Sequence, residues 1–318
     1  MNYKLCGRFD TLRKYLPDEL NISSSFDFHG LGNIRNYCPN GDSGGKECKN
    51  ELDKNKAGCL WLFEQLFLKI NKNNKKNINI VEYIMIWLGY MLTLKKDHKI
   101  NNLKEFYEDH IKNNTYYINC DNNGEDCGKS LKEATEYANY KEIIDQKMDL
   151  LNINFEDIAK FYFAFKLLCE MYYVFAENTS NCKNCSKNVN QFVEKYNKIN
   201  KDYNNTDSSP YRKILSTLSA DYNRLKDKCQ GVEDSHFPTL QTIEEKQPDV
   251  QRSGGNYRQS SEPISEVASS SSSIVSKLIP VLLIFGAIPI FWGISYKYSL
   301  FGFRKRSPKQ HLREMVKK

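Results

Sequence analysis

The strongest constraint on this chain is an uninterrupted apolar stretch near its C-terminus. Leu278 to Tyr296 reads LIPVLLIFGAIPIFWGISY and contains no charged side chain. A helix needs about 20 predominantly apolar residues to cross the core of a bilayer. Pro280 and Pro289 would interrupt a helix in water, but a spanning helix tolerates them because neighbouring groups can bond the freed carbonyls. The sequence therefore predicts one transmembrane helix over residues 277–296, with the lipid bilayer as a partner.

The residues that flank this stretch predict its orientation. Aromatic and basic side chains gather at its C-terminal end, and those expected at the membrane interface are Trp292, Tyr296, Tyr298, Arg304, Lys305 and Arg306. Because an excess of basic residues marks the cytoplasmic side, residues 297–318 are predicted to form a basic cytoplasmic tail and residues 1–276 to lie outside. Residues 1–20 carry charges throughout and lack the apolar core of a secretory signal, so we expect the C-terminal helix to direct insertion.

The distribution of charge argues against nucleic-acid binding. The formal net charge is +7, but residues 277–318 hold nine basic side chains and one acidic side chain, which leaves residues 1–276 at −1. A near-neutral domain with a cationic end is typical of a membrane-facing tail rather than of a DNA-binding face. The sequence therefore predicts no nucleic-acid partner.

All ten cysteines lie N-terminal to the apolar stretch, which favours an oxidising compartment for the large domain. Reduced, buried thiols are the alternative, because free cysteine is a common small core residue. The connectivity cannot be read from the sequence, since ten cysteines can pair in very many ways. Cys169 falls on the apolar stripe of a predicted helix, and the other nine are disulfide candidates: Cys6, Cys38, Cys48, Cys59, Cys120, Cys127, Cys182, Cys185 and Cys229.

Apolar periodicity predicts an all-α, disulfide-stapled ectodomain over residues 1–230. Regular structure is expected to begin at Gly58, and no alternating pair of strands is evident. Helices are expected over 59–70, 80–94, 103–111, 131–151 and 189–199, over a long aromatic stripe that begins after Asn154, and from Ser209 to Cys229. Residues 231–276 are rich in Ser, Pro and Gln and are predicted to form a disordered stalk.

Some motifs resemble catalytic or ligand-binding signatures, but each lacks residues that the signature requires. Gly41 to Gly45 reads GDSGG, the string around the nucleophilic serine of chymotrypsin-like proteases, but only His29 precedes it and no double β-barrel is available. The same loop lacks the Ser or Thr of a phosphate-binding loop. Cys182 and Cys185 have redox or zinc spacing without a second matching pair, so disulfide pairing is preferred over zinc. We predict no catalytic residue, cofactor, metal or small-molecule substrate.

Several local strings nevertheless resemble one family. They are SYKYSLFGFRKR at 295–306, LREMVKK at 312–318, GCLWLFEQLF at 58–67, IMIWLGYMLTL at 84–94 and YRKILSTLSADYNRLKDKC at 211–229. Together they resemble the pir (Plasmodium interspersed repeat) multigene family, in the form carried by rodent malaria parasites. The resemblance implies a non-catalytic variant antigen exported to the infected erythrocyte, with roles in immune evasion or host-cell interaction and a host-cell receptor or antibody as its partner.

Two functional hypotheses follow. In the first, the ectodomain is a displayed binding module whose loops at 37–57, 113–130, 176–188 and 200–209 vary around a fixed helical core, because loops can change without disturbing packing. In the second, the protein is an exported membrane-remodelling or trafficking component that acts through its basic tail. An enzyme would need an acid–base or metal site, and the sequence shows none.

Overall fold

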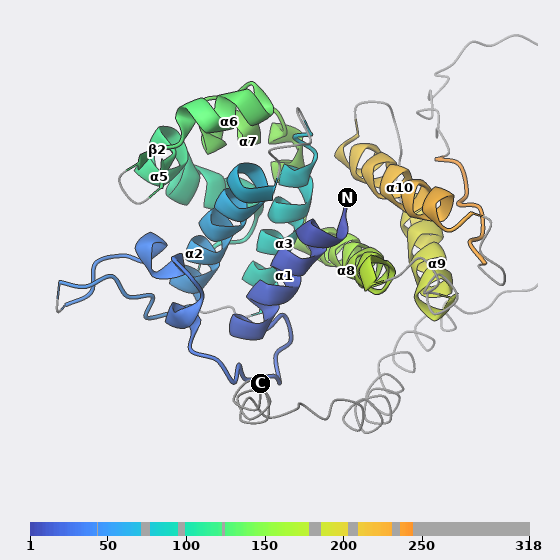
Figure 1. Ribbon diagram of the computed structural model, residues 1–318, viewed down its shortest axis with the longest axis horizontal. Coiled ribbons are helices and arrows are strands. Elements are labelled where there is room, and N and C mark those ends of the chain that lie inside the picture. Colours follow the sequence, from blue (N-terminus) through green and yellow to red (C-terminus); the bar gives the residue numbers. More distant parts are fainter. Residues whose placement is uncertain are drawn as a thin grey trace, which may run out of the picture. The chain divides into compact units, whose positions relative to one another are not determined.

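The computed structural model is predominantly helical in the part of the chain that it describes (Figure 1). These residues are 1–42, 44–70, 77–94, 99–122, 125–177, 186–202, 209–230 and 236–243, and they belong to one compact unit, Met1–Val250. The larger helices are α1 (Tyr3–Tyr15), α2 (Glu51–Phe63), α3 (Ile80–Leu94), α8 (Phe155–Glu177), α9 (Ser186–Asp202) and α10 (Pro210–Lys228). The helical fold class predicted from periodicity is confirmed.

Shorter elements connect these helices. They are α4 (Leu103–Phe106), α5 (Thr115–Asn119), α6 (Gly128–Thr135) and α7 (Tyr140–Asp145), the 3-10 helices η1 (Phe28–Gly30), η2 (Ile34–Tyr37) and η6 (Met148–Asn152), and the π-helical turns η3 (Glu64–Ile70) and η5 (Tyr107–Ile111). Within the described ranges, extended structure is limited to one small antiparallel hairpin, β1 (Asp121–Asn122) with β2 (Glu125–Asp126), and an isolated bridge between Asn40 and Lys46.

Helix α3 forms the centre of the core. Its bounds match the predicted segment, and every side chain from Ile80 to Met91 is buried. It packs between α2 on one side and α8 on the other. Gly89 permits the close approach of α8, because a Cβ atom there would lie 2.8 Å from Cδ1 of Ile158. A helix that is apolar on all faces must be covered on all faces, and α3 is.

Helix α8 supplies the second half of this core. The Asn154 side chain accepts a hydrogen bond of 2.9 Å from the Asp157 N–H and so caps the helix where the sequence predicted. The predicted stripe is buried at Ile158, Phe161, Tyr162, Phe165, Leu168, Cys169 and Tyr172. The Phe165 ring stacks on Tyr83 of α3 with centroids 4.6 Å apart. The stripe is therefore a packing surface rather than a ligand slot.

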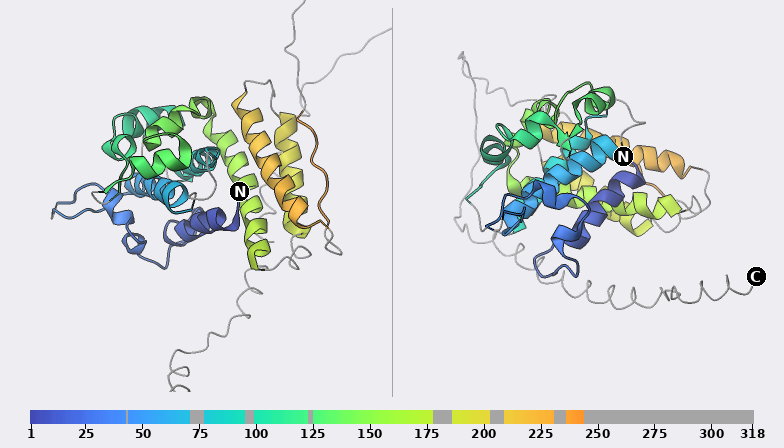
Figure 2. Two further views of the ribbon diagram at one scale, coloured as in Figure 1. Left: turned by 45° about the horizontal axis from the view of Figure 1, so that its top comes forward. Right: turned by 60° about the vertical axis from the view of Figure 1, so that its left-hand side comes forward.

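Helices α8, α9 and α10 pack against one another and form a three-helix layer beside the remainder of the fold (Figure 2). Residues 236–243 follow this layer, although the sequence assigns them to the disordered stalk. The Tyr222 hydroxyl donates a hydrogen bond of 2.8 Å to the Pro238 carbonyl, and the Leu240 side chain is buried. The chain therefore remains packed on the fold beyond Cys229.

Two α-helices, α1 and α2, begin before Gly58, where the sequence predicted no regular structure. Helix α1 begins after Asn2, whose side chain accepts from the Leu5 N–H at 2.9 Å, and α2 begins after Asn50, whose side chain accepts from the Asp53 N–H at 2.8 Å. Leu5, Phe9 and Leu12 are buried on one face of α1, but polar residues between them weaken the apolar pattern. That part of the prediction was wrong because tertiary packing stabilises these helices.

The single helix predicted over residues 131–151 is also wrong. Glu136 adopts a left-handed conformation with φ of 79° and ends α6, and the Asn139 side chain then caps α7 by accepting from the Glu142 N–H at 2.9 Å. A left-handed residue cannot continue a right-handed helix. The segment therefore divides into α6, α7 and η6, each of which has buried apolar side chains.

The membrane-related predictions concern a part of the chain that the structure does not describe. None of the described helices has both the length and the apolar character needed to cross a bilayer. The predicted span at 277–296, the tail at 297–318 and most of the stalk lie outside the described ranges. They stay predictions from the sequence.

Candidate functional site: two disulfide loops that meet on one side of the fold

The first loop is closed by a short disulfide. Cys38 and Cys48 are bonded across a sequence separation of 10, with Cα atoms 4.9 Å apart. Inside this ring the Gly41 N–H donates to the Gly45 carbonyl at 2.6 Å, and the Glu47 N–H donates to the Pro39 carbonyl at 2.9 Å. Gly44 has a φ of 79°, a conformation that glycine adopts without strain. Gly41, Gly44 and Gly45 therefore belong to the turn of a closed, hairpin-like loop.

The second loop carries the β1–β2 hairpin. Cys120 and Cys127 are bonded across a separation of 7, and the Cys127 N–H donates to the Cys120 carbonyl at 2.9 Å. Cys120 is left-handed, with φ of 47°, and ends α5. A disulfide here joins the two residues that flank the hairpin. The hairpin can therefore differ in sequence while its ends keep their positions.

Side chains join the two loops, which lie on the same side of the fold in Figure 1. The Lys46 ammonium donates to the Tyr116 hydroxyl and, at 2.5 Å, to the Asn36 carbonyl. The Tyr116 and Tyr37 rings meet edge to face with centroids 5.6 Å apart. We call the described residues of 37–50 and 113–127 the loop face. Two of the four loops that the sequence predicted to be variable thus form one surface.

The loop face is fixed to the core through a buried carboxylate. Glu64, in the π-helical turn η3, is fully buried and accepts from Asn33 Nδ2 at 2.7 Å and from the Tyr37 hydroxyl at 3.0 Å. Its Oε1 also pairs with the Lys69 ammonium at 3.0 Å. Burial, and then the nearby Glu64 charge, raise the pKa of Tyr37, so its hydroxyl remains a donor. Glu64 therefore holds the base of the loop face on the core, while Asp42 and Lys49 are exposed and form an ion pair with each other.

The cysteines differ from the predicted set at two positions. Cys169, which the sequence assigned to core packing, is bonded to Cys6 across a separation of 163 and joins α1 to α8. Cys229 is also disulfide-bonded. Cys59 is a free thiol, which corrects its assignment as a disulfide candidate: it is buried on α2 beside the Tyr117 hydroxyl, and burial raises the pKa of its thiol to about 12. Cys182 and Cys185 lie outside the described residues.

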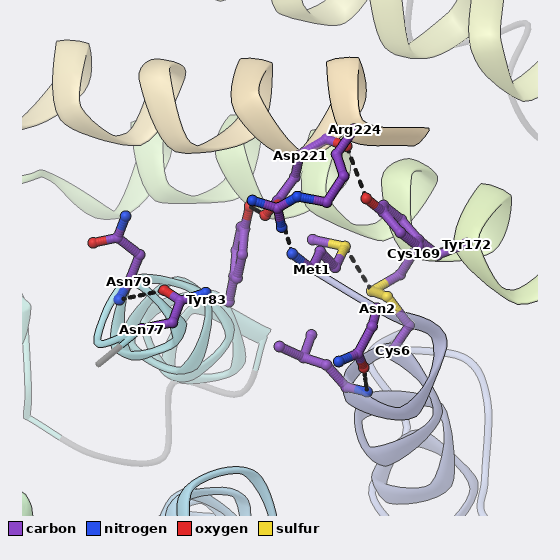
Figure 3. A network of polar contacts seen from close by, with 11 residues as sticks. Met1, Asn2, Cys6, Asn77, Asn79, Tyr83, Cys169, Tyr172, Asp221 and Arg224 are labelled. Carbon is purple, nitrogen blue, oxygen red and sulfur yellow. Dashed lines mark hydrogen bonds and ion pairs between the residues drawn. A yellow bond between two sulfur atoms is a disulfide. The ribbon is translucent and has the colours of Figure 1, made fainter. Parts of the chain in front are cut away.

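A buried polar network holds the start of α1 near the Cys6–Cys169 disulfide (Figure 3). The Met1 ammonium forms an ion pair with Asp221 of α10, whose carboxylate also accepts from the Tyr83 hydroxyl at 2.7 Å and from Arg224 Nη1 at 2.9 Å. The Tyr172 hydroxyl donates to the Asp221 carbonyl at 2.9 Å. Burial lowers the pKa of the Met1 ammonium, and Asp221 opposes that shift. Asp221 thus connects α1, α3, α8 and α10.

Comparison with known proteins assigns the family. The model of a family described as "Plasmodium variant antigen protein Cir/Yir/Bir" matches residues 6–297. This chain belongs to that family. A solved Plasmodium PIR protein ectodomain is 31% identical, with a TM-score of 0.54, and the match covers 76% of this chain and 99% of that one. No curated protein matches the chain significantly. The resemblance to the pir family seen in the sequence is confirmed.

The described residues of this variant antigen offer little for catalysis or metal binding. His29 accepts from the Cys48 N–H through Nε2 at 3.0 Å, which occupies the nitrogen that a general base would need. His29, Cys38 and Cys48 bring three candidate metal ligands within 4.8 Å of one another. However, the two sulfurs are bonded to each other, and a metal would require thiolates. Ser43 of the GDSGG string lies outside the described ranges.

The other predicted functional residues of this variant antigen cannot be placed. Trp292, Tyr296, Tyr298, Arg304, Lys305 and Arg306, expected at the membrane interface, lie outside the described residues, as do most of the loops at 176–188 and 200–209. The roles of Lys46, Glu64 and Asp221 were not predicted from the sequence. Each has at least one partner that is 27 to 220 positions away along the chain, and no local pattern predicts such pairs.

Proposed function

We propose that this variant antigen displays its helical domain on the outside of the infected erythrocyte and presents the loop face to host receptors and antibodies. The observation that supports this most strongly is the construction of the loop face. Two short disulfides and a buried anchor at Glu64 hold the ends of the two loops, and Asp42, Gly44 and Gly45 of the first loop are exposed. Loops held in this way can change sequence without disturbing the core, which suits immune evasion.

The basic tail has a supporting role in this proposal. Residues 297–318 stay in the cytoplasm of the host cell and hold the span in the bilayer through attraction to anionic lipid, about 1 kcal/mol per basic residue near the surface. The protein acts by binding rather than by catalysis. Its partners are a host-cell receptor or an antibody and the bilayer, without a nucleic acid or a small-molecule substrate.

Antibodies from infected hosts test the role of the loop face. We expect them to lose most of their binding to residues 1–250 when the loop face carries D42A, K49A and I118S. A matched variant elsewhere on the domain carries E194A, K198A and M148S. Ile118 and Met148 are each 38% exposed, so the two variants remove similar exposed groups. Titration of serum against the two folded variants measures the difference.

Equal losses of serum binding in the two variants would mean that the loop face is no more immunogenic than the rest of the domain. That result would remove the main support for an immune-evasion role. Circular dichroism and thermal unfolding of both variants should match the parent, because all six side chains are at the surface and surface substitutions usually change stability by about 0.5 kcal/mol or less.

A further inference from the structure

A cluster of exposed apolar side chains follows α1. Among the described residues, eight large apolar side chains are exposed, and three of them fall between Leu20 and Phe26: Leu20 at 65%, Ile22 at 51% and Phe26 at 52%. Single exposed apolar residues are ordinary on protein surfaces, whereas a contiguous group marks an interaction site. We call residues 17–27 the α1–η1 segment.

The α1–η1 segment has a fixed conformation. Asp18 is buried, and its carboxylate accepts from the Tyr162 hydroxyl and pairs with the Lys166 ammonium at 3.0 Å. The Tyr90 hydroxyl donates to the Asp18 carbonyl at 3.1 Å. Two helices, α3 and α8, thus hold the start of the segment. Its apolar side chains are therefore exposed by a defined backbone rather than by a lack of structure.

Hydrogen bonds and a ring contact near the C-terminal end of the α1–η1 segment also fix its conformation. The Ser24 hydroxyl donates to the Lys14 carbonyl at 2.7 Å and accepts from the Phe26 N–H at 3.0 Å. The Phe26 ring lies against Tyr15, with centroids 5.2 Å apart. A surface that already has its bound conformation loses little conformational entropy on binding. Such a surface is well suited to a partner.

Acidic side chains around this segment outnumber the basic ones. Asp27 is exposed, Asp10 is partly exposed and pairs with Lys14 at 3.3 Å, and Glu19 is half-buried beside Lys166. Next to them, between α1 and α8, is a pocket of about 290 Å³ lined by Asp10, Arg13, Glu170 and Tyr173. Burial raises the pKa of Glu170, while Lys166 and Arg13 oppose the shift. Within the pocket Arg13 pairs with Asp10 at 3.9 Å, so Glu170 is the carboxylate in excess, and it favours a cationic group.

The pocket lies near the start of the α1–η1 segment. Helices α1 and α8 pack side by side, and the segment leaves the end of α1 (Figure 1). Asp18 and Lys166, which hold the segment, are also among the charges that act on Glu170. The surface formed by α1, α8 and this segment therefore carries both the exposed apolar side chains and the pocket.

We propose that this surface docks a protein partner through a segment that combines apolar side chains with lysine or arginine. The apolar side chains cover Leu20, Ile22 and Phe26, and the cationic side chain enters the pocket beside Glu170. This inference rests on the proposed display of the domain to host cells, and it names a second contact region in addition to the loop face.

Charge favours this occupant over two others. An anionic lipid surface would be repelled by the acidic residues around the cluster, because like charges brought together raise the free energy. A second copy of the chain, paired symmetrically through the same patch, would place those acidic residues against one another. A basic and apolar protein segment complements both features of the surface.

A random peptide library displayed on phage tests the proposal with residues 1–250, which hold their own core. We expect wild-type protein to enrich peptides that contain Lys or Arg next to Leu, Phe, Tyr or Trp. The variant L20S/I22S/F26S should bind those peptides at least ten-fold more weakly. The control Y3S/I118S/M148S, which alters exposed apolar residues elsewhere, should bind them as the wild type does. E170Q should reduce the preference for Lys and Arg.

A second test uses glycans to block the surface, so it does not depend on whether the serine variants fold. Asn21-Ile22-Ser23 and Asn113-Asn114-Thr115 both have the acceptor sequence for N-glycosylation. With protein made in glycosylating cells, a glycan at Asn21 should block peptide binding and a glycan at Asn113 should not. The variants S23A and T115A remove the two acceptor sites separately, with the polypeptide otherwise unchanged.

Three results would overturn the proposal. The first is enrichment of no peptide, or of peptides that L20S/I22S/F26S binds unchanged. The second is binding of the wild type, but not of that variant, to phosphatidylserine vesicles. The third is a dimer in sedimentation that the variant loses. The serum test uses Asp42, Lys49 and Ile118, which lie outside this surface, so the loop-face proposal and the docking proposal can fail separately.

Discussion

Replacing both Cys6 and Cys169 by alanine is expected to destabilise the domain by about 5 kcal/mol, because this disulfide closes a loop of 163 residues. In the chain-entropy account, a longer closed loop restricts the unfolded chain more strongly. The bond also joins α1 to α8, which is central to the core. Denaturant unfolding of residues 1–250, with the remaining disulfides intact, measures the change.

Two controls make this result specific. Replacing Cys38 and Cys48 by alanine opens a ring of only 10 residues and should cost about 3 kcal/mol. Replacing Cys59 removes a buried thiol without a disulfide, so it reports the cost of the side chain alone, about 1 kcal/mol. If the Cys6–Cys169 variant loses no more stability than the Cys38–Cys48 variant, the long disulfide does not hold the fold as described here.

Asp221→Asn is expected to cost about 3–5 kcal/mol, the usual result of removing one partner of a buried ion pair. The variant leaves the Met1 ammonium buried without its counter-charge and disturbs the bonds from Tyr83 and Arg224. Asp149→Asn is the matched control, because Asp149 pairs with Lys213 at 2.6 Å in a partly exposed position. Exposed pairs contribute about 0–1 kcal/mol. Equal losses in the two variants would contradict the role of Asp221.

The pH dependence of the same variant gives an independent measurement. The pKa of the Met1 ammonium lies below its ordinary value of 8.0 in the folded chain. Between the folded and unfolded pKa values the unfolded chain binds more protons, so stability rises with pH there. Asp221 raises the folded pKa, and its loss should lower that pKa further. The rise in stability should therefore begin at a lower pH in D221N than in the wild type.

The parts of the fold that the sequence predicted are those with strong local patterns. Helix α3 is apolar on nearly every face, and α8 has an uninterrupted stripe with an Asn154 cap, so both were predicted from their own residues. Helix α1 was not, because its burial depends on α8 more than 140 positions away. The break at Glu136 was missed because a left-handed residue other than glycine has no sequence signature.

In the candidate site too, the features with a local sequence pattern were predicted and the contacts between distant residues were not. The loops at 37–57 and 113–130 were predicted as exposed loops between helices, but the contact that joins them, between Lys46 and Tyr116, spans 70 positions. Cys59 and Cys169 were assigned the wrong way round, because cysteine spacing does not reveal which sulfurs meet in space. The family could be identified from short strings alone because the string at residues 295–306 is highly specific.

Trypsin treatment of intact infected cells tests the display of this domain most directly. If residues 1–276 lie outside, we expect cleavage near Lys246 or Arg252, where the sequence predicts an exposed stalk. A fragment that contains residues 278–318 should remain, and an antibody against the tail should detect it only after permeabilisation. If full-length protein instead survives trypsin on intact cells and disappears after permeabilisation, the domain faces inward and the protein is not a surface antigen.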